Sequence, residues 1–298
     1  MKTLSGILVT HEHSDHIQGI DTLYLSRQLR FDDMFLMRYL PIFRLDERKK
    51  LRILEIGCGP GALAEALHRW YPQAEIIGVD RDSAFIQYAK DHIKGVKFLE
   101  GDATCLPFDD ETFDVTISNT VSEHVEPSAF YGEQKRVLKK GGICLVLSAR
   151  RGYNHRAACL EENDFEKAFW EKVQAHDHSM ETYQVCKYPL SEQEHPLMME
   201  KCGFHAVSTG YAVIDLTPDD PKYEKDIAIR MIQAGRGNDL DAVRSARKTL
   251  PDIIDGEDAE KMMEIINKKY DERIRQYLHG EKQWNTSVSV TMVIRGEK

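Results

Sequence analysis

Short apolar runs alternate with helix-forming segments from residue 51 to about residue 150. The apolar runs have the length of buried strands. They lie at 51–56, 74–79, 96–99, 113–119 and 143–147. Ser83–His92 and Pro127–Lys140, between these runs, are expected to be helices, the second of them amphipathic. The alternation predicts an α/β fold with a doubly wound, mostly parallel sheet.

The flanking parts of the chain have other patterns. Residues 20–50 carry apolar side chains at mostly helical steps, which Pro41 is expected to interrupt. Phe204–Leu216 predicts a sixth strand, and Glu257–His279, within an insertion, predicts a long amphipathic helix. Thr286–Ile294 alternates polar and apolar residues and predicts a last strand.

Composition places the chain among ordinary globular proteins. Of its 298 residues, 42% are hydrophobic and 30% are charged, which excludes a disordered tail. The formal net charge of −9 gives no overall attraction to nucleic acid or to an anionic membrane. No apolar run approaches the roughly 20 residues of a membrane helix, and no signal-peptide pattern opens the chain. Six scattered cysteines without a C-x-x-C pair predict free thiols and a cytoplasmic location.

The strand at 51–56 runs into a glycine-rich turn, Gly57-Cys58-Gly59-Pro60-Gly61, and then into helix-forming residues. Glycine lets the backbone approach a ligand closely, and the first N–H groups of a helix are unpaired. The segment therefore predicts a cofactor site. Two cofactors remain open here, because Gly57, Gly59 and Ala62 also satisfy the G-x-G-x-x-G/A pattern of dinucleotide-binding folds.

Glu55, Gly57, Gly59 and Gly61 match the motif (D/E)-x-G-x-G-x-G position for position. Here the chain resembles the class I S-adenosylmethionine-dependent methyltransferases. The resemblance continues at Asp80, which follows the second strand, where an acid can accept hydrogen bonds from both ribose hydroxyls of an adenosine.

Two later segments support the same resemblance. Gly101-Asp102-Ala103, followed by Leu106-Pro107-Phe108, resembles the G-D-A…L-P-F signature of small-molecule methyltransferases. Val137–Gly142 (VLKKGG) precedes the fifth strand, as is frequent in this class. The similarity runs from Leu51 to about Ser148, and it favours the methyltransferase over the dinucleotide enzyme.

The resemblance implies a Rossmann-like sheet of seven strands, with an antiparallel last strand between the fifth and the sixth, and a helical cap. It also implies S-adenosyl-L-methionine as cofactor, with Glu55 at the methionine end, Asp80 at the ribose and Asp102 at the adenine. The expected cofactor-binding residues are Glu55, Gly57, Cys58, Gly59, Gly61, Asp80, Arg81, Asp102, Ala103, Asn119 and Thr120.

The sequence gives fewer indications of the residues that bind the methyl acceptor. Relatives commonly have a histidine or a Glu-His pair after the fourth strand, so His124 is a candidate general base, because imidazole titrates near neutral pH. A packing or capping histidine explains His124 equally well. The other substrate candidates are Tyr24, Arg27, Glu123, Tyr153 and His155, and the first two fit solvated positions of a packing helix as well.

A second resemblance lies in residues 6–16. His11, His13, Asp15 and His16 form an H-x-H-x-D-H cluster similar to the metal-binding motif of metallo-β-lactamase-fold hydrolases. That fold needs two sheets and further ligands from distant strands, whereas the rest of this chain follows another plan. We interpret the segment as a vestigial or fused fragment, or as a coincidental polar stretch, and expect no working metal site.

These observations predict a methyltransferase whose residues align a small-molecule acceptor with the methyl donor and exclude water. Two alternatives from other classes are a non-catalytic S-adenosylmethionine sensor and a nicotinamide-dependent oxidoreductase. The apolar stripe of the helical insertion fits ordinary core and also a homodimer contact. The expected segments are 1–50 (N-terminal cap), 51–149 (cofactor-binding core), 150–216 (lid and sixth strand), 217–284 (helical insertion) and 285–298 (last strand).

Overall fold

The computed structural model describes residues 19–150, 153–176 and 186–298. The chain forms two compact units, which are treated one at a time below. The sheet unit comprises residues 30–153, 186–214 and 289–298, and the helical unit comprises residues 1–29, 154–185 and 215–288. The predicted division into five segments stays a prediction.

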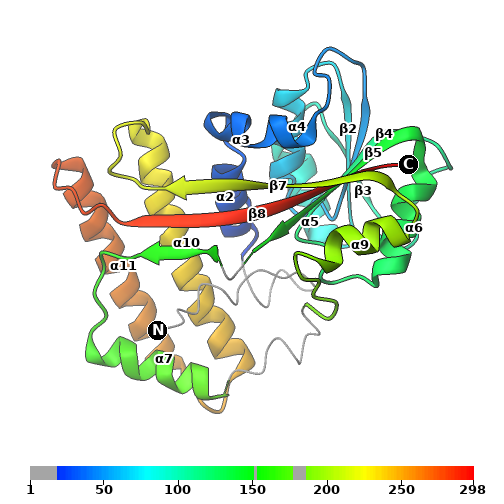
Figure 1. Ribbon diagram of the computed structural model, residues 1–298. Coiled ribbons are helices and arrows are strands. Elements are labelled where there is room, and N and C mark those ends of the chain that lie inside the picture. Colours follow the sequence, from blue (N-terminus) through cyan, green and yellow to red (C-terminus); the bar gives the residue numbers. More distant parts are fainter. Residues whose placement is uncertain (1–18, 151–152, 177–185) are drawn as a thin grey trace. The chain divides into compact units, whose positions relative to one another are not determined.

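The sheet unit is built on parallel strands, which are connected by helices except between β3 and β4, where a loop connects them (Figure 1). The sheet order is β3-β2-β1-β4-β5-β8-β6, with β7 paired to β8. The strands β1 to β5 pair in parallel, so their carboxyl ends lie at one edge. The strands are β1 (Arg52–Ile56), β2 (Glu75–Asp80), β3 (Lys97–Glu100), β4 (Phe113–Asn119), β5 (Leu138–Ala149), β6 (His155–Ala157), β7 (His205–Leu216) and β8 (Thr286–Glu297).

Helices cover the two faces of this sheet. Apolar residues of α6 (Pro127–Val137) and α9 (Glu194–Lys201) share one buried cluster with residues of β1, β2, β5 and β8. On the other face, α4 (Ala62–Trp70) and α5 (Ser83–His92) follow β1 and β2. Asp82 caps α5 by accepting hydrogen bonds from the N–H groups of Ala84 and Phe85, as the sequence predicts. The predicted doubly wound α/β fold is confirmed.

The last strand lies where the sequence analysis expects it. β8 is antiparallel to β5, with Val146 opposite Ile294, and its other neighbour is β7, the predicted sixth strand. Figure 1 shows β8 in red as one long strand beside β7. The sheet has one strand more than predicted, because the three-residue strand β6 pairs with the start of β8.

The N-terminal part of the sheet unit packs through aromatic rings. It contains the 3-10 helix η2 (Asp33–Phe35) and the helix α3 (Leu36–Phe43). Tyr39 of α3 stacks on Trp70 of α4, with ring centroids 5.5 Å apart. Pro41 was predicted to interrupt a helix, and this is wrong: α3 runs through Pro41 to Phe43. The proline stands two residues before the end of the helix, so the backbone hydrogen bond that it cannot donate is lost close to the helix terminus.

The helix α6 was predicted to extend to Lys140 and is shorter. It ends at Val137, because Leu138 has extended backbone angles and pairs with Phe113 at the start of β5. Lys139 and Lys140 therefore belong to β5. Pairing with β4 outweighs the good helix propensity of the two lysines.

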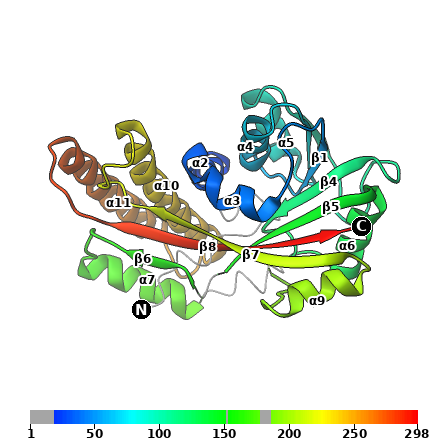
Figure 2. The same ribbon diagram turned by 45° about the horizontal axis from the view of Figure 1, so that its top comes forward.

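The helical unit has its own core. Its helices are α2 (Ile20–Arg30, which ends one residue into the sheet unit), α7 (Asp164–His176), α10 (Lys225–Thr249) and α11 (Gly256–Leu278). One buried cluster joins Phe169 of α7, Val243 of α10 and Met262 of α11. Figure 2 shows α10 and α11 side by side, as Figure 1 does. The long amphipathic helix that the sequence predicts is α11. Within the described residues, no helix combines the length and the apolar character that crossing a bilayer requires.

A buried ion pair connects α11 to the segments that flank β7 and β8. Arg273 Nη2 donates to Asp219 Oδ2 over 2.6 Å, and the two side chains are each 1% exposed. Asp219 Oδ2 also accepts the N–H groups of Gln283 and Trp284. A carboxylate with three donors holds the chain that leads into β8 against α11.

We expect Asp219→Ala to lower the free energy of unfolding by about 3–5 kcal/mol, because it leaves the charge of Arg273 buried without its partner. Urea unfolding followed by circular dichroism measures this loss. Glu264→Ala is the control, since it removes an exposed carboxylate from α11, the helix that carries Arg273, and it should change the midpoint far less. Equal losses for the two variants would contradict the role of the buried pair.

Candidate functional site

The glycine turn lies at the carboxyl end of β1 and starts α4. Gly57, Gly59 and Gly61 have φ angles of 67°, 53° and 90°, a region that side chains with a Cβ rarely adopt. The N–H groups of Gly57 and Cys58 donate to the carbonyl of Val79 on β2, over 2.7 and 3.0 Å. The turn is therefore tied to the neighbouring strand where the two strands end.

The three glycines differ in what surrounds them. A Cβ at Gly57 would lie 2.4 Å from Cγ2 of Val121, and one at Gly61 would lie 2.6 Å from Cδ1 of Ile93. A Cβ at Gly59 would meet nothing within 4 Å among the described residues. Gly57 and Gly61 therefore allow close packing inside the protein, whereas Gly59 leaves space above the turn that a ligand can fill.

Asp80, the last residue of β2, holds the turn in place. Its Oδ2 accepts the N–H of Gly59 over 2.8 Å, and its Oδ1 accepts the N–H of Asp82 over 2.9 Å. The residue is 9% exposed. Burial raises the pKa of Asp80, although the two N–H groups oppose this by stabilising the carboxylate. Each oxygen keeps a further lone pair, so the same carboxylate can still accept from a ligand.

Glu55 lies on β1 two residues before the turn and is 2% exposed. It stands opposite Gly78 of β2 and Ile117 of β4 in the register of the sheet. Burial raises the pKa of the neighbouring Cys58 thiol, and the nearby charges of Glu55 and Asp80 raise it further. Cys58 is thus a neutral buried thiol beside two acidic side chains, which rules out a thiolate role for it at neutral pH.

Asp102 follows β3 at the same edge. Its Oδ1 accepts the N–H and the hydroxyl of Thr104, over 2.7 and 2.6 Å, which is the geometry of an Asx turn. These hydrogen bonds lower the pKa of Asp102, and the charge of Arg81 lowers it further. The side chain is exposed, and the hydrogen bonds from Thr104 leave Oδ2 able to accept from a ligand.

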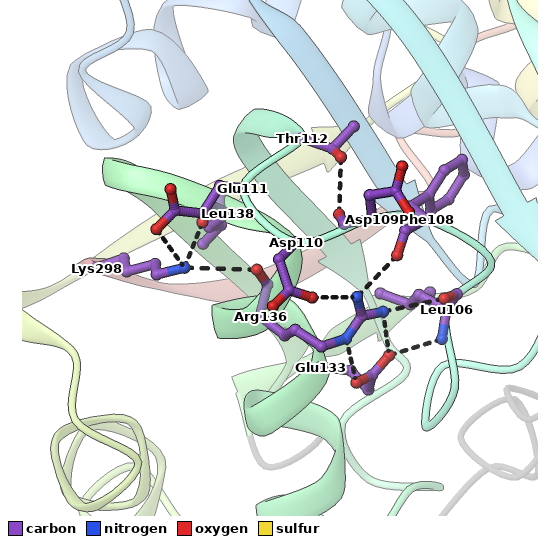
Figure 3. A network of polar contacts seen from close by, with 10 residues as sticks. All are labelled: Leu106, Phe108, Asp109, Asp110, Glu111, Thr112, Glu133, Arg136, Leu138 and Lys298. Carbon is purple, nitrogen blue, oxygen red and sulfur yellow. Dashed lines mark hydrogen bonds and ion pairs between the residues drawn. The ribbon is translucent and has the colours of Figure 1, made fainter.

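The loop after Asp102 is fastened to α6 by a network that the sequence analysis missed (Figure 3). Arg136 donates to the carbonyls of Phe108 and Leu106 over 2.8 and 3.0 Å and pairs with Asp110 and Glu133. Glu133 in turn accepts the N–H of Leu106 over 2.8 Å. The L-P-F segment of the predicted signature is therefore held from both its N–H and its C=O groups.

The end of β4 turns sharply. Thr120 has a φ of +55°, an uncommon conformation for a β-branched residue, and it is 2% exposed. Its N–H donates to Leu147 of β5, and its hydroxyl donates to the carbonyl of Asn119. The turn places Val121 against Gly57, so the segments after β4 and after β1 are in contact. A strained residue at this position is typical of a functional edge.

The segment beyond this turn contacts residues 186–188. Tyr188 N–H donates to the carbonyl of Glu123 over 2.9 Å, and Cys186 N–H donates to Nδ1 of His124 over 3.2 Å. A neutral imidazole whose Nδ1 accepts carries its proton on Nε2. In this arrangement His124 can accept a further proton only by losing the bond to Cys186.

The predicted residues fall into three groups. The eleven expected cofactor-binding residues lie in the sheet unit, at the carboxyl ends of β1 to β4. Glu123 and the exposed Tyr153 belong to the same unit, whereas Tyr24, Arg27 and His155 belong to the helical unit. His11, His13, Asp15 and His16 lie outside the described residues, in which no group of three or more potential ligands could hold a metal ion.

A buried polar cluster at the end of β5 was not predicted. Arg150 follows β5 and is 9% exposed, and its Nη2 donates to Ser148 and lies 3.2 Å from Nε2 of His195 on α9. His195 is 1% exposed. Burial and, to a smaller extent, the charge of Arg150 lower the pKa of His195 to about 4. Arg150 and His195 are 45 positions apart in the sequence, so no local sequence pattern contains both.

The family comparison decides between the two cofactor interpretations. Residues 54–146, which contain the glycine turn, Asp80 and Asp102, match the family model described as "Methyltransferase domain". This stretch of the chain is thus similar to methyltransferase domains. The predicted resemblance is confirmed, and the domain covers the same stretch, from β1 to β5, that carries the motifs.

Curated relatives agree over part of the chain. "Fatty-acid O-methyltransferase" of Mycolicibacterium smegmatis is 32% identical over 161 residues, which cover 44% of this chain and 58% of that protein. "Phthiotriol/phenolphthiotriol dimycocerosates methyltransferase 1" of Mycobacterium ulcerans is 39% identical over 103 residues, which cover 33% of this chain and 38% of that protein. The chain thus spans between about two fifths and three fifths of the length of these relatives.

Two solved structures share the fold over nearly the whole chain. A chain from a Haloferax volcanii complex that contains the Trm112 methyltransferase activator is 16% identical, with 97% of this chain and 99% of the other covered and a TM-score of 0.52. Phosphoethanolamine N-methyltransferase 2 of Haemonchus contortus, in complex with S-adenosyl-L-methionine, is 16% identical, with 96% and 59% covered and a TM-score of 0.50. At this level of identity the likeness supports the fold alone.

The neutral state of His195 predicts a pH-dependent stability. Between pH 6.5 and about 4 the unfolded chain binds a proton at this histidine and the folded chain does not, so the free energy of unfolding should fall as the pH falls. His195 should contribute at most about 3 kcal/mol to this fall. His195→Gln should flatten that part of the profile, measured by urea unfolding, whereas His205→Gln, at an exposed histidine, should not. Parallel profiles for wild type and His195→Gln would contradict this role.

Proposed function

We propose that the protein transfers the methyl group of S-adenosyl-L-methionine to a small-molecule acceptor. The observation that carries the proposal is the glycine turn, in which the N–H of Gly59 is bonded to Asp80 while the space above Gly59 is open. The family match over residues 54–146 supports the same cofactor. These residues fit a nucleoside cofactor, because carboxylates and a backbone segment without side chains, at the glycines, lie at one edge of the sheet.

The roles proposed for the residues follow from their positions along this edge of the sheet. S-adenosyl-L-methionine, when bound, supplies an activated methyl group on a sulfonium. We propose that Asp80 accepts hydrogen bonds from the ribose, that Asp102 accepts one from the adenine, and that Glu55 lies at the methionine end with Asn119 and Thr120. The chain has to hold the donor and the acceptor in line and to exclude water, and neither task requires a nucleophilic side chain.

The acceptor is proposed as a small organic molecule. The relatives named above are a fatty-acid O-methyltransferase and a lipid methyltransferase, and both names describe small acceptors rather than nucleic acid or protein. Tyr24, Arg27, Glu123, Tyr153 and His155 stay candidates for its binding. A cytoplasmic location and a homodimer through the helical insertion also stay predictions from the sequence.

We expect Gly59→Ala to weaken binding of S-adenosylhomocysteine by about tenfold or more, because the methyl group enters the ligand space. Gly141→Ala is the matched control: Gly141 has a φ of 71°, and a Cβ there also meets nothing within 4 Å among the described residues. The two variants carry the same backbone cost of about 1–2 kcal/mol, so a difference in affinity reports the ligand. Titration calorimetry measures it.

Three outcomes separate the alternatives in this experiment. Binding of NAD without binding of S-adenosylhomocysteine would contradict the proposed function and favour the oxidoreductase. Equal loss in Gly59→Ala and Gly141→Ala would place the nucleoside elsewhere. S-adenosylhomocysteine binding without methyl transfer to any member of an acceptor panel would favour the sensor.

His124 should act by position rather than as a general base. Gln can accept the Cys186 N–H in place of Nδ1, so His124→Gln should lower kcat/KM by less than about tenfold and leave its pH profile unchanged. A general base would instead show a loss of about 10²–10⁴ and the disappearance of one pKa from the profile. Steady-state kinetics from pH 5.5 to pH 9 measures both quantities.

A further inference from the structure

Arg150 is a buried cation with little negative charge around it. Its Nη1 donates to the carbonyl of Leu190 over 3.1 Å, and its Nη2 donates to Ser148. Among the described residues its one ion-pair partner is Glu192, 3.5 Å away, whose side chain is 40% exposed. A guanidinium that is 9% exposed therefore has, among the described residues, a single carboxylate partner, at a distance that is long for a hydrogen bond, and that partner is partly exposed to water.

Two donors of this cluster are buried and have no partner within the part of the chain that the structure describes. One is the Nε–H of Arg150. The other follows from the contact between Arg150 Nη2 and His195 Nε2. A guanidinium only donates, so Nε2 accepts, and the neutral imidazole carries its proton on Nδ1, which is also buried and without a partner. Buried donors of this kind cost free energy unless an acceptor meets them.

The cluster lies at the edge where open α/β sheets bind their ligands. Ser148 and Arg150 stand at the carboxyl end of β5, next to the end of β4, where Thr120 N–H donates to Leu147. Arg150 N–H donates to Val290 of β8, which fixes the backbone beside the edge. The carboxylates assigned to the cofactor, on Glu55, Asp80 and Asp102, belong to β1 and β2 and to the turn after β3, so the positive cluster is a separate part of the same edge.

We propose that Arg150 and His195 form a subsite that binds a carboxylate group of the methyl acceptor. The inference rests on the proposed function where it calls the ligand a methyl acceptor. The binding of a carboxylate at this cluster does not depend on that function. The oxygens of a carboxylate can accept hydrogen bonds from the Arg150 Nε–H and the His195 Nδ1–H, and its negative charge balances the positive charge of the guanidinium. The carboxylate can be the group that receives the methyl or a handle that orients another nucleophile.

The test measures carboxylate binding directly. Acetate, benzoate and octanoate are titrated beside acetamide, benzamide and octanamide, at pH 7.5 and constant salt, with protein saturated with S-adenosylhomocysteine and with protein free of it. We expect at least one acid to bind about tenfold or more tightly than its amide. Arg150→Gln should abolish this preference and leave S-adenosylhomocysteine affinity within about twofold.

Arg295→Gln is the matched control, because Arg295 is 8% exposed and donates to the carbonyl of Phe43 and to Glu297. It should keep the preference for the acid. If thermal unfolding shows that Arg150→Gln does not fold, Arg150→Lys and His195→Gln replace it, and each should lower affinity for the acid and not for the amide. Methylation of the preferred acid to its ester, or at another atom, distinguishes the reacting group from the handle.

The proposal is overturned if no acid binds better than its amide, or if the preference survives in the variants at Arg150 and His195. Loss of the preference in Arg295→Gln as well would also overturn it, since the effect would then not belong to the subsite. Failure of S-adenosylhomocysteine to bind contradicts the proposed function instead, and the titrations without it judge the carboxylate subsite on their own.

Discussion

The hydrogen bonds from Gly59 and Asp82 to the carboxylate of Asp80 are the constraint on which this edge of the sheet depends. They join the turn after β1 to the turn after β2, and the N–H groups of Gly57 and Cys58 add hydrogen bonds to the carbonyl of Val79 on β2. The open space above Gly59 exists because a fixed carboxylate holds the backbone there at a positive φ. Burial makes that carboxylate costly, as its raised pKa shows, and the two N–H groups offset part of the cost.

The other segments of the edge are placed by contacts with this turn or by clamps of their own. Val121 packs on Gly57 only because Thr120 adopts a strained positive φ at the end of β4. The loop after β3 is held by the N–H of Gly101, which donates to the carbonyl of Asp80 over 2.9 Å, and by Arg136 from α6. Fixed segments of this kind suit the proposed methyl transfer, since small displacements of donor and acceptor would reduce its rate strongly.

Local patterns predicted the elements that local forces determine. β4 (Phe113–Asn119) and α5 (Ser83–His92) have the predicted bounds, because an apolar run and a capping aspartate define them. The end of α6 was missed, since pairing of Leu138 with Phe113 outweighs helix propensity. The clamp at Arg136 and the pair of Arg150 with His195 join residues about 30 and 45 positions apart, so no local window contains them. The acidic site residues were predicted because each belongs to a sequence motif near the end of a strand, whereas Arg150 follows β5 without a motif.

Charge is distributed along this edge in a way that suits two different ligands. The acidic side chains Glu55, Asp80 and Asp102 lie at β1, at β2 and after β3, where they attract a cationic ligand such as a sulfonium nucleoside. The buried guanidinium of Arg150 lies at β5, beside a histidine that its low pKa keeps neutral, where an anionic ligand is favoured. Parallel strands bring all these groups to one edge although they are spread over a hundred residues of sequence. The acidic side chains would therefore attract a cationic methyl donor and repel an anionic acceptor. Arg150 would do the reverse, so each ligand would be directed to its own part of the edge.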